Sequence, residues 1–246
     1  MLEAAYYPMF VSLSQRVCLV VGGGNVGERK IRSLLFHGAS IRLVSRDLTE
    51  WLHMRHREGN LDWVGATYDE LFLRDADLVF AATSDEDLNR RIAADARKHK
   101  IWCNMATDPQ LGTFIVPSIV RRGPLTIAIS TTGQSPAVAK LIREKLEEQF
   151  GFEWVFSLEL MGLLRSAIQS KKLSSHEKQS LFRKIAGLPL PDWICKNRWE
   201  QSVEAVREIC HPWLSLDEIN QLWNEAWKNS SSSLPHCATA AQPLDT

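Results

Sequence analysis

The sequence predicts an α/β protein with a doubly wound parallel sheet, followed by a small β-rich region and a C-terminal helical domain. Three observations support this fold class. Apolar runs alternate with amphipathic stretches over about residues 10–110, which is typical of βαβ units. Two β-rich runs separated by Arg-Arg-Gly-Pro follow Thr113, and beyond Phe150 the apolar residues recur at helical spacing without strand-like runs.

The first apolar run, residues 17–21, leads directly into the pattern Gly22-x-Gly24-x-x-Gly27. This spacing predicts a site for a dinucleotide pyrophosphate. Gly22 permits a tight turn, Gly24 lets the backbone approach the phosphates, and Gly27 lets the following helix lie close to the strand. The alternative is three glycines that only make a flexible turn, but the flanking strand and helix signals favour a Rossmann-like dinucleotide-binding domain over residues 1–112.

The remainder of this domain continues the alternation of strands and helices. We expect strands at 41–44, 61–64, 77–82 and 100–104, and helices at 48–58 and 85–99. Strands separated by helices of this length imply a parallel sheet, whose carboxyl edge is where cofactor and substrate meet.

Residues 113–150 have a different character and are predicted to be a dimerisation region. The β-rich runs 114–120 and 125–130 indicate an antiparallel pair that is too small for a core of its own, so pairing with a second chain predicts a homodimer. Ser135 followed by Pro136 predicts the start of a helix, with Val138 and Leu141 on its apolar face.

Beyond this region we expect a small helical domain over 151–228, with helices near 153–170, 174–186, 199–209 and 215–228. Its six tryptophans are expected to pack a small core. The Ser-rich residues 229–246 are predicted to be a disordered tail.

Composition bounds the partners and the location of the chain. Its 246 residues carry 29 Lys and Arg against 29 Asp and Glu, so no overall field favours nucleic acid or a membrane. The five cysteines are scattered, and the first residues lack the features of a signal peptide, so we expect reduced thiols and a cytoplasmic protein. The seven histidines show no zinc-type ligand spacing, and we expect no metal site.

Cofactor choice is usually decided just after the second strand. Asp47 stands 20 positions past Gly27, as expected for a carboxylate that binds the ribose of NAD, whereas neighbouring Arg46 would suit NADP. We expect NAD. Asp47 has an alternative interpretation as a helix cap ahead of Leu48. Thr83, after the next central strand, is expected to line the nucleotide site, although an ordinary loop would look the same.

Substrate and catalytic candidates follow the last strand of the sheet and the β-rich region. Asp108 is the candidate general base, with a turn ahead of Pro109 as the alternative. Asn104, in the same segment, is expected to contact the substrate. Arg121, with Arg122 and later basic residues, would form a cationic wall, and the hydroxyls of Thr131 and Ser135 suit the capture of carboxylates, although such groups are often only solvated.

Four segments, residues 21–30, 103–109, 114–131 and 133–147, together resemble the siroheme-synthase family, specifically its precorrin-2 dehydrogenase module. The resemblance covers about residues 5–150. It implies an NAD-binding domain, a dimerisation region and a small helical domain. It also implies NAD-dependent oxidation of precorrin-2, a tetrapyrrole, to sirohydrochlorin. By the same resemblance, Asn25, Val26, Arg46 and Asp47 contact the dinucleotide.

One departure from the family pattern leaves alternatives open. The family places an aspartate three residues after the asparagine, where this chain has Thr107, and Asp108 is displaced by one position. On an extended segment such a shift turns the side chain to the opposite face. The first hypothesis is therefore a dehydrogenase alone. The alternatives are a bifunctional enzyme that also inserts ferrous iron and, from another class, an NAD-sensing regulatory domain.

Overall fold

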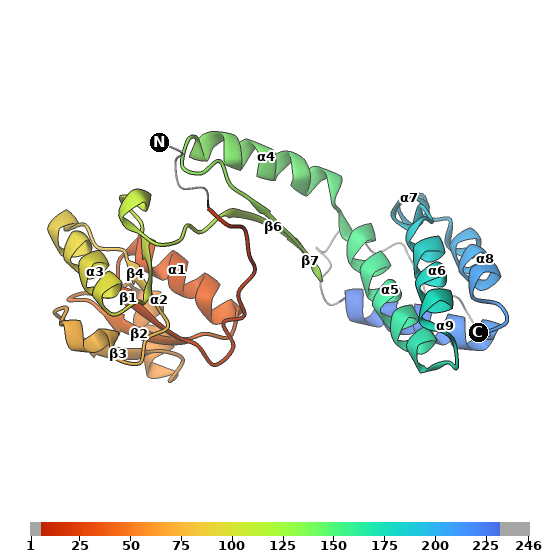
Figure 1. Ribbon diagram of the computed structural model, residues 1–246, viewed down its shortest axis with the longest axis horizontal. Coiled ribbons are helices and arrows are strands. Elements are labelled where there is room, and N and C mark those ends of the chain that lie inside the picture. Colours follow the sequence, from red (N-terminus) through yellow and green to blue (C-terminus); the bar gives the residue numbers. More distant parts are fainter. Residues whose placement is uncertain (1–5, 232–246) are drawn as a thin grey trace. The chain divides into compact units, whose positions relative to one another are not determined.

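The computed structural model describes residues 6–231, which form two compact units (Figure 1). Of the described residues, those up to Val116 together with Thr132–Gln134 form the first unit, and Pro117–Thr131 together with those from Ser135 onward form the second. The predicted region 113–150 is thus divided between the units, and its larger part belongs with the helices.

The first unit is built on a five-stranded sheet in the order β3-β2-β1-β4-β5, with every pair parallel. Its strands are β1 Val17–Val21, β2 Ser40–Val44, β3 Asp62–Gly65, β4 Leu78–Ala81 and β5 Trp102–Met105. The predicted doubly wound sheet is confirmed. The chain moves outward from β1 to β3 and then returns to place β4 on the other side of β1, so the carboxyl ends of β1 and β4 mark the switch point where such sheets bind ligands.

Both faces of the sheet are covered, because alternate residues of β1 point to opposite sides. Cys18 and Val20 pack with α1 (Asn25–Phe36) and α2 (Glu50–Arg57). Leu19 and Val21 pack with α3 (Glu86–Lys98) and the 3-10 helix η1 (Glu70–Leu73). A β1 strand with its core residues buried on both faces explains the continuous apolar run in the sequence.

The second unit begins with the antiparallel hairpin β6 (Ser118–Arg122) and β7 (Leu125–Ile129), which turns at Gly123 with a positive φ of 52°. The predicted first run of this pair was wrong over 114–117. Pro117 has no N–H to donate to a ladder. Upstream of it, the Thr113 N–H instead donates to the Cys103 carbonyl in the first unit.

Helix α4 (Pro136–Gln149) follows, and Ser135 caps it as predicted by accepting the Val138 N–H. Among its residues only Ala139 is buried, and the predicted apolar face is open: Val138, Leu141 and Ile142 are 45%, 51% and 37% exposed.

Five helices complete the second unit: α5 Phe152–Ser170, α6 Ser175–Ala186, α7 Leu190–Cys195, α8 Trp199–Cys210 and α9 Leu216–Ser231. The sequence missed α7, which has six residues and a proline in its first turn. Four of the six tryptophans pack the core as predicted: Trp223 is 2% exposed, and Trp193, Trp199 and Trp227 pack against its buried cluster. The ring of Phe156 meets those of Trp199, Trp223 and Trp227 at centroid distances of 4.9–6.0 Å. For Trp213 the prediction was wrong, because this side chain is 38% exposed.

The predicted disordered tail began too early. Helix α9 continues through Asn229 to Ser231, and the buried Ser230 hydroxyl donates to the Ala226 carbonyl at 2.6 Å. A serine run can extend a helix when its hydroxyls bond to the preceding turn. The other predicted tail residues, 232–246, lie outside the described part of the chain.

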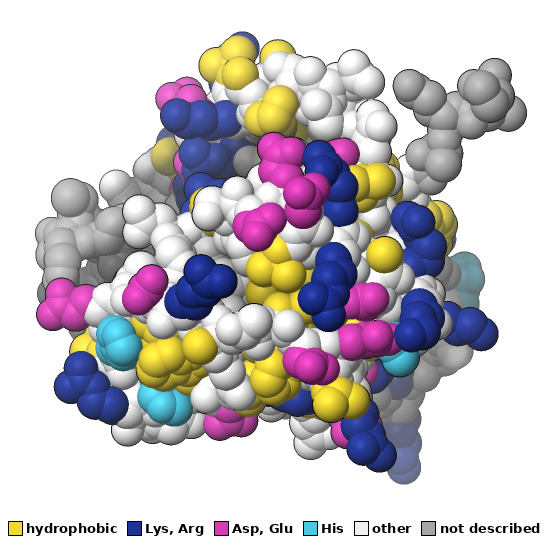
Figure 2. Space-filling model, turned by 90° about the vertical axis from the view of Figure 1, so that its left-hand side faces the viewer, with side chains coloured by type: hydrophobic (Ala, Val, Ile, Leu, Met, Phe, Trp, Pro, Cys, Tyr) yellow, Lys and Arg dark blue, Asp and Glu magenta, His cyan; other side chains and the backbone are white. Residues whose placement is uncertain are grey.

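The distribution of surface charge and the state of the cysteines agree with what the composition predicts. On the face of the molecule seen in Figure 2, basic and acidic side chains are interspersed. Cys18, Cys103, Cys195 and Cys210 carry free thiols, whereas Cys237 lies outside the described residues. Within 6–231, no helix has both the length and the apolar character needed to cross a membrane.

Candidate functional site

The glycine turn joins the carboxyl end of β1 to the start of α1. Gly22 adopts a φ of +113°, and a Cβ placed there would lie 2.5 Å from the Ala82 carbonyl oxygen after β4. A Cβ at Gly27 would collide with the Gly22 carbonyl. Only glycine satisfies both positions, so these two residues let β1, β4 and α1 approach one another closely.

Gly24 is different, because a Cβ built there would have no atom within 4 Å. It is exposed and stands at the N-cap of α1, whose first turn has no side-chain cap. Asn25 and Val26, the first residues of the helix, are also exposed. The turn thus offers an open backbone surface at the positive end of a helix, which suits a pyrophosphate. The fold of the turn does not itself require a glycine at 24, but close approach of a ligand to this backbone would.

The residues expected to read the ribose follow β2. Arg46 and Asp47 are both exposed. The alternative role of Asp47 as a helix cap is wrong, because α2 begins at Glu50 and the Thr49 hydroxyl accepts the Leu52 N–H at 3.3 Å. The two side chains remain our predicted contacts of the dinucleotide.

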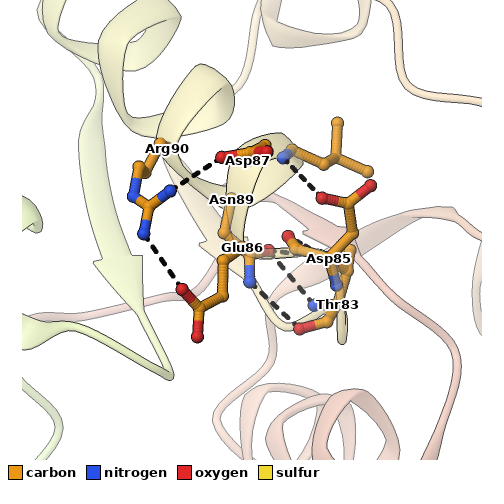
Figure 3. Close-up of polar contacts among 7 residues, drawn as sticks. Thr83, Asp85, Glu86, Asp87, Asn89 and Arg90 are labelled. Atoms are coloured by element: carbon orange, nitrogen blue, oxygen red, sulfur yellow. Dashed lines mark hydrogen bonds and ion pairs between the residues drawn. The ribbon is translucent and has the colours of Figure 1, made fainter.

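Thr83 follows β4 and is fixed by Asn89 of α3 (Figure 3). The Asn89 carbonyl oxygen accepts from the Thr83 hydroxyl at 2.8 Å and from its N–H at 3.3 Å. The Asn89 amide group donates to the Thr83 carbonyl at 3.0 Å. Asn89 is fully buried, so this internal network holds the loop that lies against Gly22 in a single shape.

Asn104, the second candidate from the sheet, is 4% exposed, and its amide is bonded within the first unit. Its oxygen accepts from the Lys30 ammonium of α1 at 2.7 Å, and its nitrogen donates to the Phe114 carbonyl at 3.1 Å. Burial, and secondarily Arg29, lowers the pKa of Lys30. The geometry favours a role for Asn104 in fixing the segment after β5, and its contact with substrate stays a prediction.

Asp108 and Thr107 lie in the exposed loop after β5. Asp108 Oδ1 accepts the Gln110 N–H at 3.0 Å, immediately before the 3-10 helix η2 (Pro109–Leu111). This is the turn geometry given above as the alternative for Asp108. It uses one carboxylate oxygen, so it is compatible with a catalytic role and does not demonstrate one.

The other substrate candidates belong to the second unit. Arg121 lies in β6, and the Thr131 hydroxyl donates to the Ser135 carbonyl at 3.0 Å and accepts the Ser135 N–H at 3.2 Å. Arg122, expected in a cationic wall, instead donates to the Phe150 and Glu147 carbonyls at 2.6 and 2.9 Å. Its guanidinium therefore terminates α4, as basic side chains commonly do at the carboxyl end of a helix.

No cluster of three or more His, Cys, Asp or Glu side chains suited to holding a metal ion occurs in residues 6–231. Burial raises the pKa of the Cys103 thiol to about 11, so this group beside Asn104 is protonated at neutral pH and is a poor metal ligand or nucleophile.

Sequence reasoning missed three residues of this region. Asn89 carried a usable signal, since it is a polar residue on the same helical stripe as the buried Ile92 and Ala96. Lys30 and Ser45 carried no such signal. Lys30 bonds to Asn104, 74 positions away along the chain, and the Ser45 hydroxyl accepts the N–H of Gly23, 22 positions away.

The sheet and its glycine turn define a nucleotide-binding protein of the doubly wound class. Comparison with known families agrees: residues 9–118 match the family described as "Putative NAD(P)-binding", and residues 122–149 match "Sirohaem biosynthesis protein central". The chain belongs to the siroheme-synthase family over the region that these matches cover, as the resemblance of its motifs predicted.

Individual relatives support this membership. The chain is 34% identical over 204 residues to Siroheme synthase 1 of Serratia proteamaculans, covering 83% of this chain and 42% of that protein. It is 37% identical over 180 residues to Siroheme synthase 1 of Pectobacterium atrosepticum, covering 73% and 38%. The chain thus spans about two fifths of the length of these relatives. Among solved structures, "SirC, precorrin-2 dehydrogenase" matches with a TM-score of 0.68 and 26% identity, over 83% of this chain and 98% of that one.

Proposed function

We propose that this chain is an NAD-dependent precorrin-2 dehydrogenase, which oxidises precorrin-2 to sirohydrochlorin in siroheme biosynthesis. The observation that carries the proposal is the glycine turn, in which Gly22 and Gly27 are required by the fold whereas Gly24 leaves the backbone open at the start of α1. The similarity to a solved protein titled precorrin-2 dehydrogenase, over nearly all of that protein, supports the choice of substrate.

The oxidation removes two hydrogens from the macrocycle, one as hydride and one as a proton. A bound NAD would supply the acceptor for the hydride. The first turn of α1 would hold its pyrophosphate, and Arg46 and Asp47 would contact its ribose. Asp108 is the proposed base for the proton, since only Oδ1 accepts the Gln110 N–H and Oδ2 is left for the substrate.

The candidates for binding carboxylate side arms of the substrate stay those predicted from the sequence, each within its own unit: Asn104 in the first, and Arg121, Thr131 and Ser135 in the second. An arginine and a capped helix start are groups that bind carboxylates well. We further propose that the chain works as a cytoplasmic homodimer. The support for a dimer is the exposed row of Val138, Leu141 and Ile142 on α4, next to a hairpin of only two strands.

The direct test is anaerobic incubation of the purified protein with precorrin-2 and NAD, with NADH and sirohydrochlorin measured by absorbance. We expect both products in equal amounts. Asp108→Ala should slow the reaction by about 100-fold or more, within the range for loss of a general base, without weakening NADH binding. A wild-type rate in Asp108→Ala would remove Asp108 from the mechanism while leaving the dehydrogenase assignment intact.

The same preparation distinguishes the alternative functions. Consumption of ferrous iron together with sirohydrochlorin would identify a bifunctional enzyme, which the threonine at position 107 disfavours. Tight NADH binding without turnover of precorrin-2 would instead support an NAD-sensing regulatory domain.

A further inference from the structure

One residue of the glycine turn, Gly23, is bonded to the loop after β2 through both of its backbone groups. Its N–H donates to the Ser45 hydroxyl oxygen at 2.8 Å, and its carbonyl accepts the Thr49 N–H at 3.2 Å. Gly23 is buried, and a Cβ there would lie 2.5 Å from the Asp47 carbonyl oxygen. The loop after β2 is therefore packed directly on the turn.

The Ser45 hydroxyl completes this contact from the other side. While it accepts from Gly23, it donates to the Asp47 carbonyl at 2.7 Å. Its own backbone is held by β3, since the Ser45 N–H donates to the Gly65 carbonyl at 3.0 Å and the Trp63 indole N–H donates to the Ser45 carbonyl at 3.0 Å. One side chain thus joins the turn to the two residues predicted to read the ribose.

Thr49 adds a second connection to the helix that starts at the turn. Its hydroxyl donates to the Glu28 carboxylate of α1, in addition to capping α2. Glu28 is also ion-paired with Arg32 at 2.7 Å. The first turn of α1 and the start of α2 are consequently bonded to each other through the same loop.

We infer that Ser45 is a positioning residue for dinucleotide binding. It holds the turn that receives the pyrophosphate in a fixed position relative to the backbone of Arg46 and Asp47. The single proton of its hydroxyl and one of the two lone pairs are used inside the protein, so Ser45 has no donor left for a phosphate and acts through the turn. The Gly23 N–H is likewise occupied, and the phosphates are bound beyond it, from Gly24 to Val26. This inference rests on the proposed binding of a dinucleotide.

Because Ser45 orders the site before the ligand binds, loss of its hydroxyl should weaken the affinity for the dinucleotide and leave the rate of the chemical step unchanged. Without the hydroxyl, Gly23 loses an acceptor and the Asp47 carbonyl loses a donor, and both backbone segments must be ordered when the ligand binds. Loss of two neutral hydrogen bonds corresponds to an increase in the dissociation constant of about ten-fold.

The test is calorimetric titration of the full-length protein with NADH, for the wild type, Ser45→Ala, Ser45→Thr and Ser40→Ala. Ser40 is exposed at the opposite end of the same strand, so it is the matched control. We expect an about ten-fold higher dissociation constant in Ser45→Ala with unchanged stoichiometry, recovery of most of the affinity in Ser45→Thr, and no change in Ser40→Ala. With precorrin-2 as substrate, KM for NAD should rise in Ser45→Ala while kcat stays close to the wild-type value.

Several outcomes would overturn the inference. A wild-type dissociation constant in Ser45→Ala would show that the contact does not set the site. A fall in stoichiometry at constant affinity would indicate a merely structural role, because it reports fewer folded molecules. Equal losses in Ser45→Ala and Ser45→Thr would exclude the hydroxyl as the cause. If the wild type itself binds no dinucleotide, the proposed function fails. That result is distinguishable from the outcomes above, because they are differences between the Ser45 variants and a wild type that binds.

Discussion

Replacement of Gly24 by alanine separates ligand binding from folding at the glycine turn. The φ of Gly24 is −80°, which alanine adopts without strain, and no atom lies within 4 Å of the added Cβ. Reduced freedom of the unfolded chain should stabilise the protein by about 0.4–1 kcal/mol, and alanine is a poorer N-cap than glycine by a similar amount. The two effects offset each other, so the melting temperature should stay within about 2 °C of the wild-type value.

The same methyl group would stand where the pyrophosphate is expected to approach the backbone. A steric cost of about 1–3 kcal/mol would raise the dissociation constant of NADH by about 5–150-fold. Gly22→Ala is the contrasting variant, because its φ of 113° and the 2.5 Å approach to the Ala82 oxygen oppose any Cβ. We expect Gly22→Ala to lower both the melting temperature and the affinity.

Thermal unfolding followed by circular dichroism, with NADH titration of the same samples, measures both quantities. A stable Gly24→Ala variant that binds NADH as well as the wild type would refute the reasoning, because the open side of the turn would then not be the ligand's approach. A destabilised variant would show that Gly24 is required by the fold after all.

Three further predictions concern other parts of the chain. Asn89→Ala should lower the free energy of unfolding by about 2–3 kcal/mol, because the partly buried polar groups of Thr83 lose their fully buried partner. The urea midpoint measures this, and an unchanged midpoint would contradict it. Hydrogen bonding from Thr49, and then Arg32, holds the pKa of Glu28 below its usual 4.5, so its stabilising contribution is present above that pH and is lost as the pH falls through the folded value. The difference in unfolding free energy between the wild type and Glu28→Gln should accordingly shrink on acidification, and a constant difference would exclude the linkage. Leu141→Glu on α4 should convert the proposed dimer to a monomer in light scattering while NADH binding persists, whereas an unchanged mass would place the interface elsewhere.

Much of the first unit was predictable because its signals are local. The central strands β1 and β4 are short apolar runs buried on both faces, and the glycine spacing marks the turn without reference to distant residues. Ser135 and Pro136 likewise define the start of α4 by themselves. Such features depend on the backbone preferences of a few adjacent residues, so they can be recognised from the sequence alone.

Two of the errors have the opposite cause, since they depend on contacts that are distant in sequence. Residues 114–117 have strand-like composition, but Phe114 pairs its carbonyl with Asn104 instead of extending β6. In the sequence, Arg122 is typical of a solvated surface cation, but in the structure it donates to carbonyl groups at the carboxyl end of α4. A hydrogen bond between residues that are tens of positions apart produces no repeating pattern in the sequence, so pattern reasoning cannot predict it.

The tryptophans of the second unit have a practical consequence for every binding experiment on this protein. Six of the nine tryptophans lie in the second unit, several of them in mutual ring contact around Phe156. Intrinsic emission will therefore report mainly the melting of the helices and only weakly the unit that contains the glycine turn. A nucleotide that protects the sheet could leave that signal almost unaltered, so its effect must be followed by a probe placed on the sheet or by the optical properties of the nucleotide itself.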